Sequence, residues 1–336
     1  MLKTRKKVIL ISLTIVILVL VITIPLIFLF RYIPINTREI GQINTGGKAI
    51  DVDIEGEIAY VIDMMDYNPG GLVIIDVSDP YNPQRLGSFY DGGIIMAVDV
   101  VGSIAFLANQ VTGLEVIDVS NPSFPVKLDS YPGGLFDIQI HGELAYVTNW
   151  NTGLIILNVS NPSDIVFMSQ FPITGACIHV DVYDDIAYVI EHYEDYSGLK
   201  LIDVSNPFNP FQIGSYSPSG VDFWNPIIEG NYAYIGNHAL DGGGLHILDI
   251  SNPSNIHQVG FYYGGGSIFA AYIHNTKVFC ANYEIGLEVL DMTNPISLQK
   301  IGQYYDGGGA HNVVVVDNYA YLADHNDGLE IIEILN

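Results

Sequence analysis

Seven polar side chains that could bind a hard cation recur at one position of a repeated unit. Each follows a short apolar run and carries a carboxylate or amide oxygen, the ligand type that calcium takes in proteins. The seven residues are Asp63, Asn109, Asn149, Glu191, Asn237, Asn282 and Asp324. The carboxylates among them, Asp63, Glu191 and Asp324, form the candidate calcium site. Asp and Asn also begin turns well, and repetition in every unit favours that structural interpretation.

A second group of side chains has the composition of a binding surface. The loops of the fourth and fifth units combine aromatic rings, imidazoles and carboxylates, which suit a carbohydrate or a basic peptide. The residues are His192, Tyr193, Glu194, Asp195, Tyr196, Trp224, His238 and Asp241. The alternative is that these rings pack down over their own units. We take this group as the preferred binding surface, because the longer loops of the repeat gather there.

Enzyme motifs give little support to a catalytic function. The sequence contains no CxxCH, P-loop or nucleophile-elbow motif. A sialidase-type site needs several arginines to bind a carboxylate, and after residue 37 only Arg38 and Arg85 occur. No catalytic residue is therefore assigned, and a binding or interaction scaffold is the preferred function. A calcium-dependent hydrolase or lactonase stays an alternative, as does a structural part of a cell envelope.

One repeated phrase positions all of these side chains. Its cleanest copy is GLEVIDVSNP, from Gly113 to Pro122. The other copies begin at Gly71, Gly153, Gly198, Gly244, Gly286 and Gly328. Successive glycines are 42, 40, 45, 46, 42 and 42 residues apart, a period typical of propeller blades. Seven copies of one unit predict a single closed repeat domain.

Each unit contains four short apolar runs separated by turn residues, which predicts a four-stranded meander. The third run is apolar on both faces, as expected for a strand between neighbouring sheets. The second run sets a small residue before an aromatic one, such as Ala59 before Tyr60, and this alternation suits interlocking wedges. The Asp, Ser and Pro that end the phrase are turn formers, so we assign them no catalytic function.

The two ends of the chain are expected to share the last blade. REIGQI, from Arg38 to Ile43, matches the run that follows each phrase elsewhere, and the chain ends on the phrase itself. The sequence therefore predicts an all-β fold over residues 38–336: a seven-bladed β-propeller of four-stranded blades, closed by an N-terminal outer strand.

The repeated LVIIDVSDP, LEVIDVSNP and LKLIDVSNP resemble the LVIVD-repeat proteins. The resemblance covers roughly residues 38–336. It implies a β-propeller of a family found mostly in exported or surface-attached bacterial and archaeal proteins. It implies no particular activity, because propellers host adhesion modules, hydrolases and oxidoreductases alike.

Charge divides the chain into two parts. Residues 1–38 contain six basic residues and no acidic one, whereas residues 39–336 contain six basic and 37 acidic residues, a net charge of −31. A surface this negative repels phosphate backbones, so nucleic acid is not an expected partner. It attracts cations and basic proteins.

The N-terminal part is expected to anchor the protein in a membrane. Residues 8–30 contain no charge, and a helix of this length spans about 35 Å, enough to cross a bilayer. We expect a cytoplasmic basic tail (1–7), a transmembrane signal anchor (8–30) and a linker (31–37). The basic residues before the helix keep the N-terminus in the cytoplasm, so the propeller faces outward. An unidentified extracellular protein or carbohydrate is then the expected partner.

A cleaved signal peptide is the competing interpretation of this segment. The apolar run is longer than the apolar region of most signal peptides, and no small-x-small cleavage site follows it in RYIPINTREI. Both observations favour the anchor.

Overall fold

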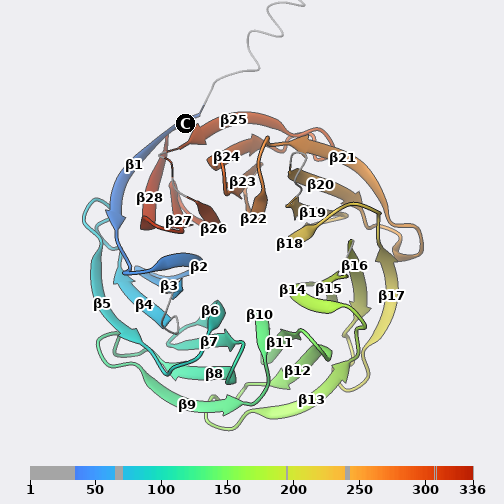
Figure 1. Ribbon diagram of the computed structural model, residues 1–336, viewed down its shortest axis with the longest axis horizontal. Coiled ribbons are helices and arrows are strands. Elements are labelled where there is room, and N and C mark those ends of the chain that lie inside the picture. Colours follow the sequence, from blue (N-terminus) through green and yellow to red (C-terminus); the bar gives the residue numbers. More distant parts are fainter. Residues whose placement is uncertain are drawn as a thin grey trace, which may run out of the picture. The chain divides into compact units, whose positions relative to one another are not determined.

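Seven four-stranded antiparallel sheets stand around a common axis in the computed structural model of the chain (Figure 1). The structure describes residues 35–64, 71–193, 196–238, 243–305, 307 and 309–335. It divides the chain into Met1–Ile35 and Asn36–Asn336, and all seven sheets belong to the second unit. The all-β, seven-bladed propeller expected from the repeats is confirmed.

Several sequence predictions concern residues that the structure does not describe. The basic tail (1–7) and the transmembrane segment (8–30) lie outside the described residues, and so do Glu194, Asp195 and Asp241. In the described part of the chain, no helix is long and apolar enough to cross a membrane. The helix found there is the single turn η1 (Pro253–Asn255), which Asn252 caps.

Each blade contains an inner, a second, a third and an outer strand, counted from the axis. The inner strands are β2 (Lys48–Glu55), β6 (Ile95–Val101), β10 (Leu135–His141), β14 (Ala176–Tyr183), β18 (Phe223–Glu229), β22 (Ile268–His274) and β26 (Ala310–Val316). The second strands are β3 (Ile58–Met64), β7 (Ile104–Asn109), β11 (Leu144–Asn149), β15 (Ile186–His192), β19 (Tyr232–Asn237), β23 (Lys277–Asn282) and β27 (Tyr319–Asp324).

The repeated phrase forms the third strand of every blade, and the segment after it forms the outer strand. The third strands are β4 (Gly71–Asp76), β8 (Gly113–Asp118), β12 (Gly153–Asn158), β16 (Ser197–Asp203), β20 (Gly244–Asp249), β24 (Gly286–Asp291) and β28 (Gly328–Leu335). The outer strands are β5 (Gln84–Phe89), β9 (Val126–Tyr131), β13 (Val166–Phe171), β17 (Phe211–Tyr216), β21 (His257–Tyr263), β25 (Gln299–Tyr304) and, from the start of the chain, β1 (Asn36–Ile43).

The two ends of the propeller meet in one sheet, as the sequence predicts. β1 pairs antiparallel with β28 in the order β1-β28-β27-β26, and Figure 1 shows the blue β1 beside the red β28. The strand begins at Asn36, before the expected boundary at Arg38. Outer contacts reinforce the closure, because the Tyr304 hydroxyl of β25 donates to Glu39 Oε2 at 2.8 Å.

The hydrophobic core lies between neighbouring blades. Tyr60 and Leu72 of blade 1 pack with Ile95 and Leu107 of blade 2. Ala59, the neighbour of Tyr60, faces the other way and packs against blade 7. The small and the aromatic residue of the second strand thus fill opposite faces of one blade, which is the wedge packing expected from the repeats.

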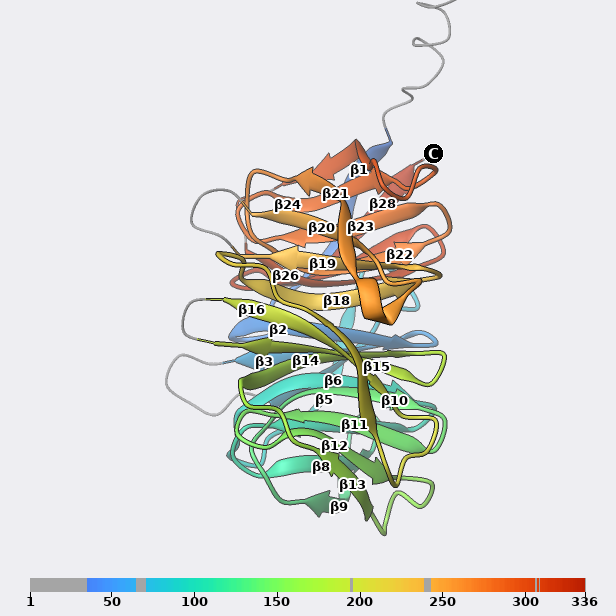
Figure 2. The ribbon, with the colours of Figure 1, turned by 90° about the vertical axis from the view of Figure 1, so that its right-hand side faces the viewer.

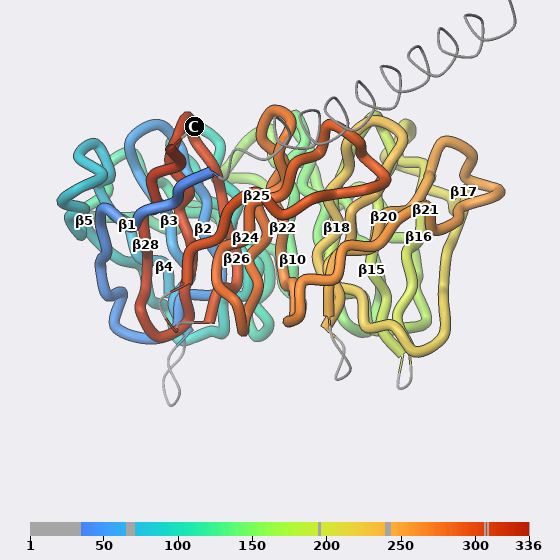
Figure 3. Tube along the Cα trace, turned by 90° about the horizontal axis from the view of Figure 1, so that it is seen from above, coloured from blue at the N-terminus to red at the C-terminus, as the bar shows by residue number. Residues whose placement is uncertain are grey.

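The turns gather at two ends of the ring, with the strands running between them (Figures 2 and 3). One end, here called the mouth, contains the turns from the second to the third strands. Because Ile43 pairs with Leu329 near the mouth and Asn36 pairs with Leu335, the propeller begins at the opposite end. The Ser-Asn-Pro turns after the third strands also lie at that opposite end.

Gly41 tests the closure by β1. A Cβ atom at this position would collide with the carbonyl oxygen of Pro80, in the turn that follows β4 of blade 1. We expect Gly41→Ala to lower the free energy of unfolding by about 1–3 kcal/mol, because the backbones must separate. Urea denaturation measures the change, and Gln42→Ala, an exposed neighbour, is the control. An unchanged midpoint for Gly41→Ala would contradict this packing of the closing strand.

Candidate functional site

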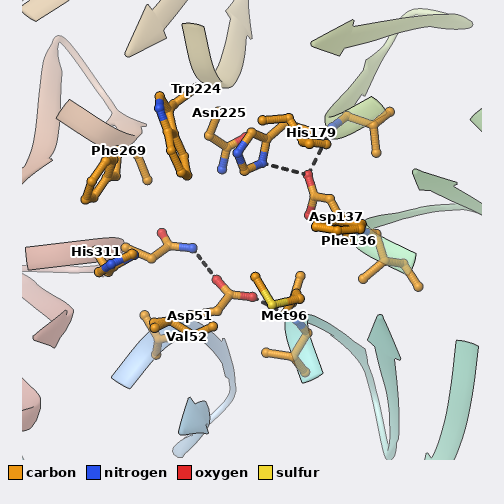
Figure 4. A pocket seen from close by; sticks show the side chains of 18 of the residues that line it. Asp51, Val52, Met96, Phe136, Asp137, His179, Trp224, Asn225, Phe269 and His311 are labelled. Atoms are coloured by element: carbon orange, nitrogen blue, oxygen red, sulfur yellow. Dashed lines mark hydrogen bonds and ion pairs between the residues drawn. The ribbon is translucent and has the colours of Figure 1, made fainter. Parts of the chain in front are cut away.

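A cavity of about 650 Å³ lies on the axis and is lined by residues of all seven inner strands (Figure 4). Residues at the ends of second strands, including Met64, Trp150, His192 and His325, also line it, which places it toward the mouth. Its wall combines aromatic rings, imidazoles, carboxylates and aliphatic side chains.

A bulge in every inner strand turns extra side chains into this cavity. In blade 1, Ala49 and Asp51 oppose the consecutive residues Asp63 and Ile62, so Ile50 is the additional residue. In β18 the shift includes both Trp224 and Asn225. The bulge residues of the other five blades are Met96, Phe136, Ile178, Phe269 and His311. A bulge re-aims side chains, and both the bulge residue and the next one line the cavity.

The residues that follow the bulges form a second ring of side chains, which is more polar and lies farther from the mouth. Its members are Asp51, Ala97, Asp137, His179, Asn225, Ala270 and Asn312. The carboxylates in this ring hold the neighbouring blade: Asp51 Oδ2 accepts from the Val98 backbone N–H at 2.7 Å, and Asp137 Oδ2 accepts from that of Val180 at 2.9 Å. Asn312 Nδ2 of blade 7 donates to Asp51 Oδ1, so this polar link crosses the closure of the ring.

A third ring, two residues further along, repeats the same link. Asp53, Asp99 and Asp181 accept backbone N–H groups of the next inner strand, from Val100 (2.7 Å), Ile140 (2.6 Å) and Ile228 (3.0 Å), respectively. Burial, together with the charges of nearby aspartates, raises the pKa of Asp99 to about 7. Burial raises the pKa of Asp181 to about 6. Burial also raises the pKa of Asp51 well above its usual value.

Aromatic rings connect blades 5, 6 and 7, where the inner strands carry no aspartate. The Trp224 and Phe269 ring centroids are 4.7 Å apart, and those of Phe269 and His311 are also 4.7 Å apart. Rings from second strands and the residues after them pack over this row. We call the whole group the aromatic arc: His192, Trp224, His238, Phe269, Tyr283, His311 and His325.

Two imidazoles of the arc favour the neutral form. Burial and the neighbouring His325 lower the pKa of His311 to about 4. Burial also lowers the pKa of His192, whose Nε2 donates to the carbonyl oxygen of Phe223 at 2.6 Å. At the rim, the Asp222 carboxylate lies 3.2 Å from Nδ1 of both His192 and His238. His192 and His311 therefore favour uncharged ring faces, beside the Asp222 carboxylate at the rim.

The structure brings together part of the binding surface expected from the sequence. His192, Trp224 and His238 lie in the aromatic arc. Tyr193 and Tyr196 stack on each other at 4.7 Å beside the arc, and they are absent from the described lining of the cavity. The Tyr193 hydroxyl donates to Glu191 Oε2 at 2.9 Å, so this ring packs over its own blade.

Two carboxylates of the candidate calcium site, Asp324 and Glu191, have partners within their own blades. Asp324 Oδ1 accepts from the Gly309 backbone N–H at 2.6 Å, and Glu191 Oε1 lies 2.9 Å from Lys200 Nζ. Asp63 is fully buried under the turn that leads into β2, next to Gly47. In the described ranges, no group of three or more His, Cys, Asp or Glu side chains is arranged to hold a metal ion. The calcium site at Asp63, Glu191 and Asp324 stays a prediction.

The cavity wall itself was missed by reasoning from sequence. Asp51, Phe136, Asp137, Phe269 and His311 lie inside inner strands, and no binding function was predicted for them from the sequence. The alternation from Asp51 to Ile54, Asp-Val-Asp-Ile, is regular, so the sequence pattern alone gives no sign of the bulge before it.

The LVIVD repeat family matches six segments of the chain. They are residues 46–91, 92–133, 132–172, 175–217, 224–263 and 307–336. These segments coincide with blades 1 to 5 and blade 7, and the resemblance expected from the repeated phrase is confirmed. Blade 6 is not matched, although β22 to β25 form the same sheet. No curated protein matches the chain.

Solved propeller structures share the fold at low sequence identity. A protein from Lactobacillus plantarum is 13% identical, with a TM-score of 0.65, over 79% of this chain and 87% of that one. The computationally designed Ika8 protein is 10% identical, with a TM-score of 0.63, over 89% and 100%. The WD40 domain of Toxoplasma gondii coronin is 10% identical, with a TM-score of 0.63, over 90% and 88%. At these identities the likeness concerns the fold alone.

The Asp99 carboxyl group is expected to make the protein more stable at about pH 5 than at about pH 8. Its pKa of about 7 in the folded protein exceeds the ~3.9 of an unfolded chain, so the folded state binds more protons between these values. The stabilisation is complete below about pH 4 and is lost as the pH rises through about 7.

Asp99→Asn cannot titrate, yet it keeps an oxygen for the Ile140 N–H. We expect the difference in melting temperature between about pH 5 and about pH 8 to be smaller by a few degrees in Asp99→Asn than in the wild type. The control is Asp118→Asn, whose carboxylate caps an exposed turn and has a lowered pKa. If the melting temperature changes with pH equally in the wild type and in Asp99→Asn, Asp99 does not titrate in this range.

Proposed function

This chain belongs to the LVIVD repeat family, and we propose that it is a membrane-anchored, extracytoplasmic binding module whose ligand enters the axial channel from the mouth. The observation that carries the proposal is the cavity of about 650 Å³, with the aromatic arc on one side and carboxylates on the other. Pockets of roughly 300–1,000 Å³ with apolar walls and a few polar groups are typical of small-ligand sites.

The side chains of the cavity suit binding better than catalysis. Its described lining contains no Ser, Thr, Cys or Lys that could act as a nucleophile, and no Arg. Its aspartates accept backbone N–H groups of neighbouring blades, as Asp137 does from Val180. They are therefore committed to holding the ring, and the aromatic faces are left for a ligand.

The proposed location rests on the sequence before the propeller. The uncharged residues 8–30 and the basic residues that precede them favour an anchor with a cytoplasmic N-terminus. The chain enters the propeller at Asn36, at the end of the ring opposite the mouth. The mouth is thus at the other end of the ring from the residue at which the chain enters the propeller.

Cysteine labelling tests the proposed location. Both native cysteines, Cys177 and Cys280, are fully buried, so they give little background. Ser219 is exposed in the loop before β18. In intact cells with a single membrane, a membrane-impermeant maleimide is expected to label the full chain carrying Ser219→Cys, and not the wild type. Labelling only after lysis would contradict an extracytoplasmic propeller.

Tryptophan fluorescence tests the proposed binding site. The chain has two tryptophans, Trp150 and Trp224, and both line the cavity. A ligand found by screening neutral sugars, amino acids and amines against the full chain is expected to shift the emission. The shift should persist in Trp150→Phe and fall strongly in Trp224→Phe, because Trp224 lies deeper. Calorimetric binding without any change in emission would place the ligand outside the channel.

A further inference from the structure

We propose that the channel binds a small organic cation with a methylated ammonium group, held between the aromatic arc and the carboxylates of blades 1 to 4. This inference rests on the proposed function, since it names the class of molecule bound in the same cavity. Three properties of the described wall support it: the sign of its charge, the chemistry of its rings, and the existing hydrogen bonds of its carboxylates.

The first property is the sign of the charge. The described lining contains five aspartates and no Lys or Arg. The aspartates are Asp51, Asp53, Asp99, Asp137 and Asp181. Burial favours the neutral form of two of the four lining histidines, His311 and His192. A third, His179, has its Nδ1 3.4 Å from Asp137 Oδ2. Burial raises the pKa of Asp51, Asp99 and Asp181, so a bound cation would favour the ionised form of these groups, and the ionised wall repels carboxylates and phosphates.

The second property is the row of ring faces. Trp224, Phe269 and His311 follow one another around the wall with centroid separations of 4.7 Å. A cation within about 6 Å of such a face is attracted by the electron density of the ring. Figure 4 shows Asp137 across the pocket from Phe269 and His311. A bound cation would therefore have aromatic faces on one side and negative charge on the other.

The third property separates methylated ammonium groups from primary amines and sugars. Both oxygens of Asp51 already accept hydrogen bonds, from Val98 and Asn312. Both oxygens of Asp137 do so as well, from Val180 and Ile138 at 2.9 Å. Each of these oxygens has one lone pair left, so the two carboxylates offer fewer acceptors to a primary amine or a sugar than free carboxylates would. A methylated ammonium group needs charge and apolar contact instead, and quaternary ammonium ions are the ligands that aromatic cages typically hold.

The rim of the mouth is also acidic. The Asp222 carboxylate, 40% exposed, stands between His192 and His238. The net charge of −31 on residues 39–336 adds a long-range attraction. Both features favour the approach of a cation.

Choline and its uncharged isostere 3,3-dimethylbutan-1-ol test the proposal directly, because they share a shape and differ in charge. The full chain in detergent is titrated with each, and binding is followed by calorimetry and tryptophan emission. We expect choline to bind at least about tenfold more tightly than the alcohol, and its affinity to fall with added NaCl.

Two substitutions with matched controls locate the cation. Phe269→Leu removes a ring face, and Asp137→Asn removes a charge while keeping an oxygen for Val180. Each is expected to weaken choline about tenfold. Phe124→Leu, on an exposed outer turn, is the control for the ring. Asp129→Asn is the control for the charge, because Asp129 also accepts a backbone N–H of the next blade, from Ile165 at 2.8 Å, outside the described cavity lining.

The outcomes distinguish this inference from the proposed function. Equal or tighter binding of the alcohol, or of glucose, with a change in tryptophan emission would overturn the cation and keep the channel as a binding site. If choline binds with the same affinity to Phe269→Leu and Asp137→Asn and leaves the tryptophan emission unchanged, both this inference and the proposed binding site are wrong. If Asp137→Asn does not fold, Phe269→Leu and the comparison of choline with the alcohol still test whether the channel binds a cation.

Discussion

The unpaired edge of the inner strands is the constraint on which the rest of the structure depends. Each inner strand pairs with one strand only, so its other edge presents backbone N–H groups that need partners. Aspartates on blades 1 to 4 meet this need from the neighbouring blade, as Asp51 does for Val98 and Asp99 for Ile140. The links hold the blades together at the axis. They also place a column of carboxylates in a confined space.

In blades 5 to 7, contacts between aromatic rings connect the inner strands in place of aspartate hydrogen bonds. Trp224, Phe269 and His311 stack from blade to blade where the aspartates are missing, and the rings behind them complete the aromatic arc. A repeat fold thereby acquires a polar side and an aromatic side within one cavity. This asymmetry, rather than any single residue, makes the channel a plausible ligand site, because seven identical blades would offer the same surface in all directions.

The channel carboxylates connect stability with ligand class. Burial and the proximity of other aspartates raise the pKa of Asp99 to about 7, so its ionisation works against the folded state. A cation in the cavity would favour the ionised form that the empty cavity disfavours. The residues that join the blades would then also select the charge of the ligand. Such a double function explains why polar groups occupy positions that a purely structural core would fill with aliphatic side chains.

The repeated phrase was enough to predict seven blades, four strands in each blade, and a last blade shared by the two ends of the propeller. These features follow from local patterns. Each copy of the phrase is flanked by turn residues and alternating apolar residues, and REIGQI resembles the outer strands of the other blades although it lies at the start of the propeller. The sequence also identified His192, Trp224 and His238, because rings in long loops stand out in composition. It missed Asp51, Phe136, Asp137, Phe269 and His311. Their orientation depends on a bulge, which exists only when an inner strand pairs with its neighbour and gains one residue against it. The contents of the channel were decided by the tertiary structure, because only ring closure brings seven separated strands to one axis.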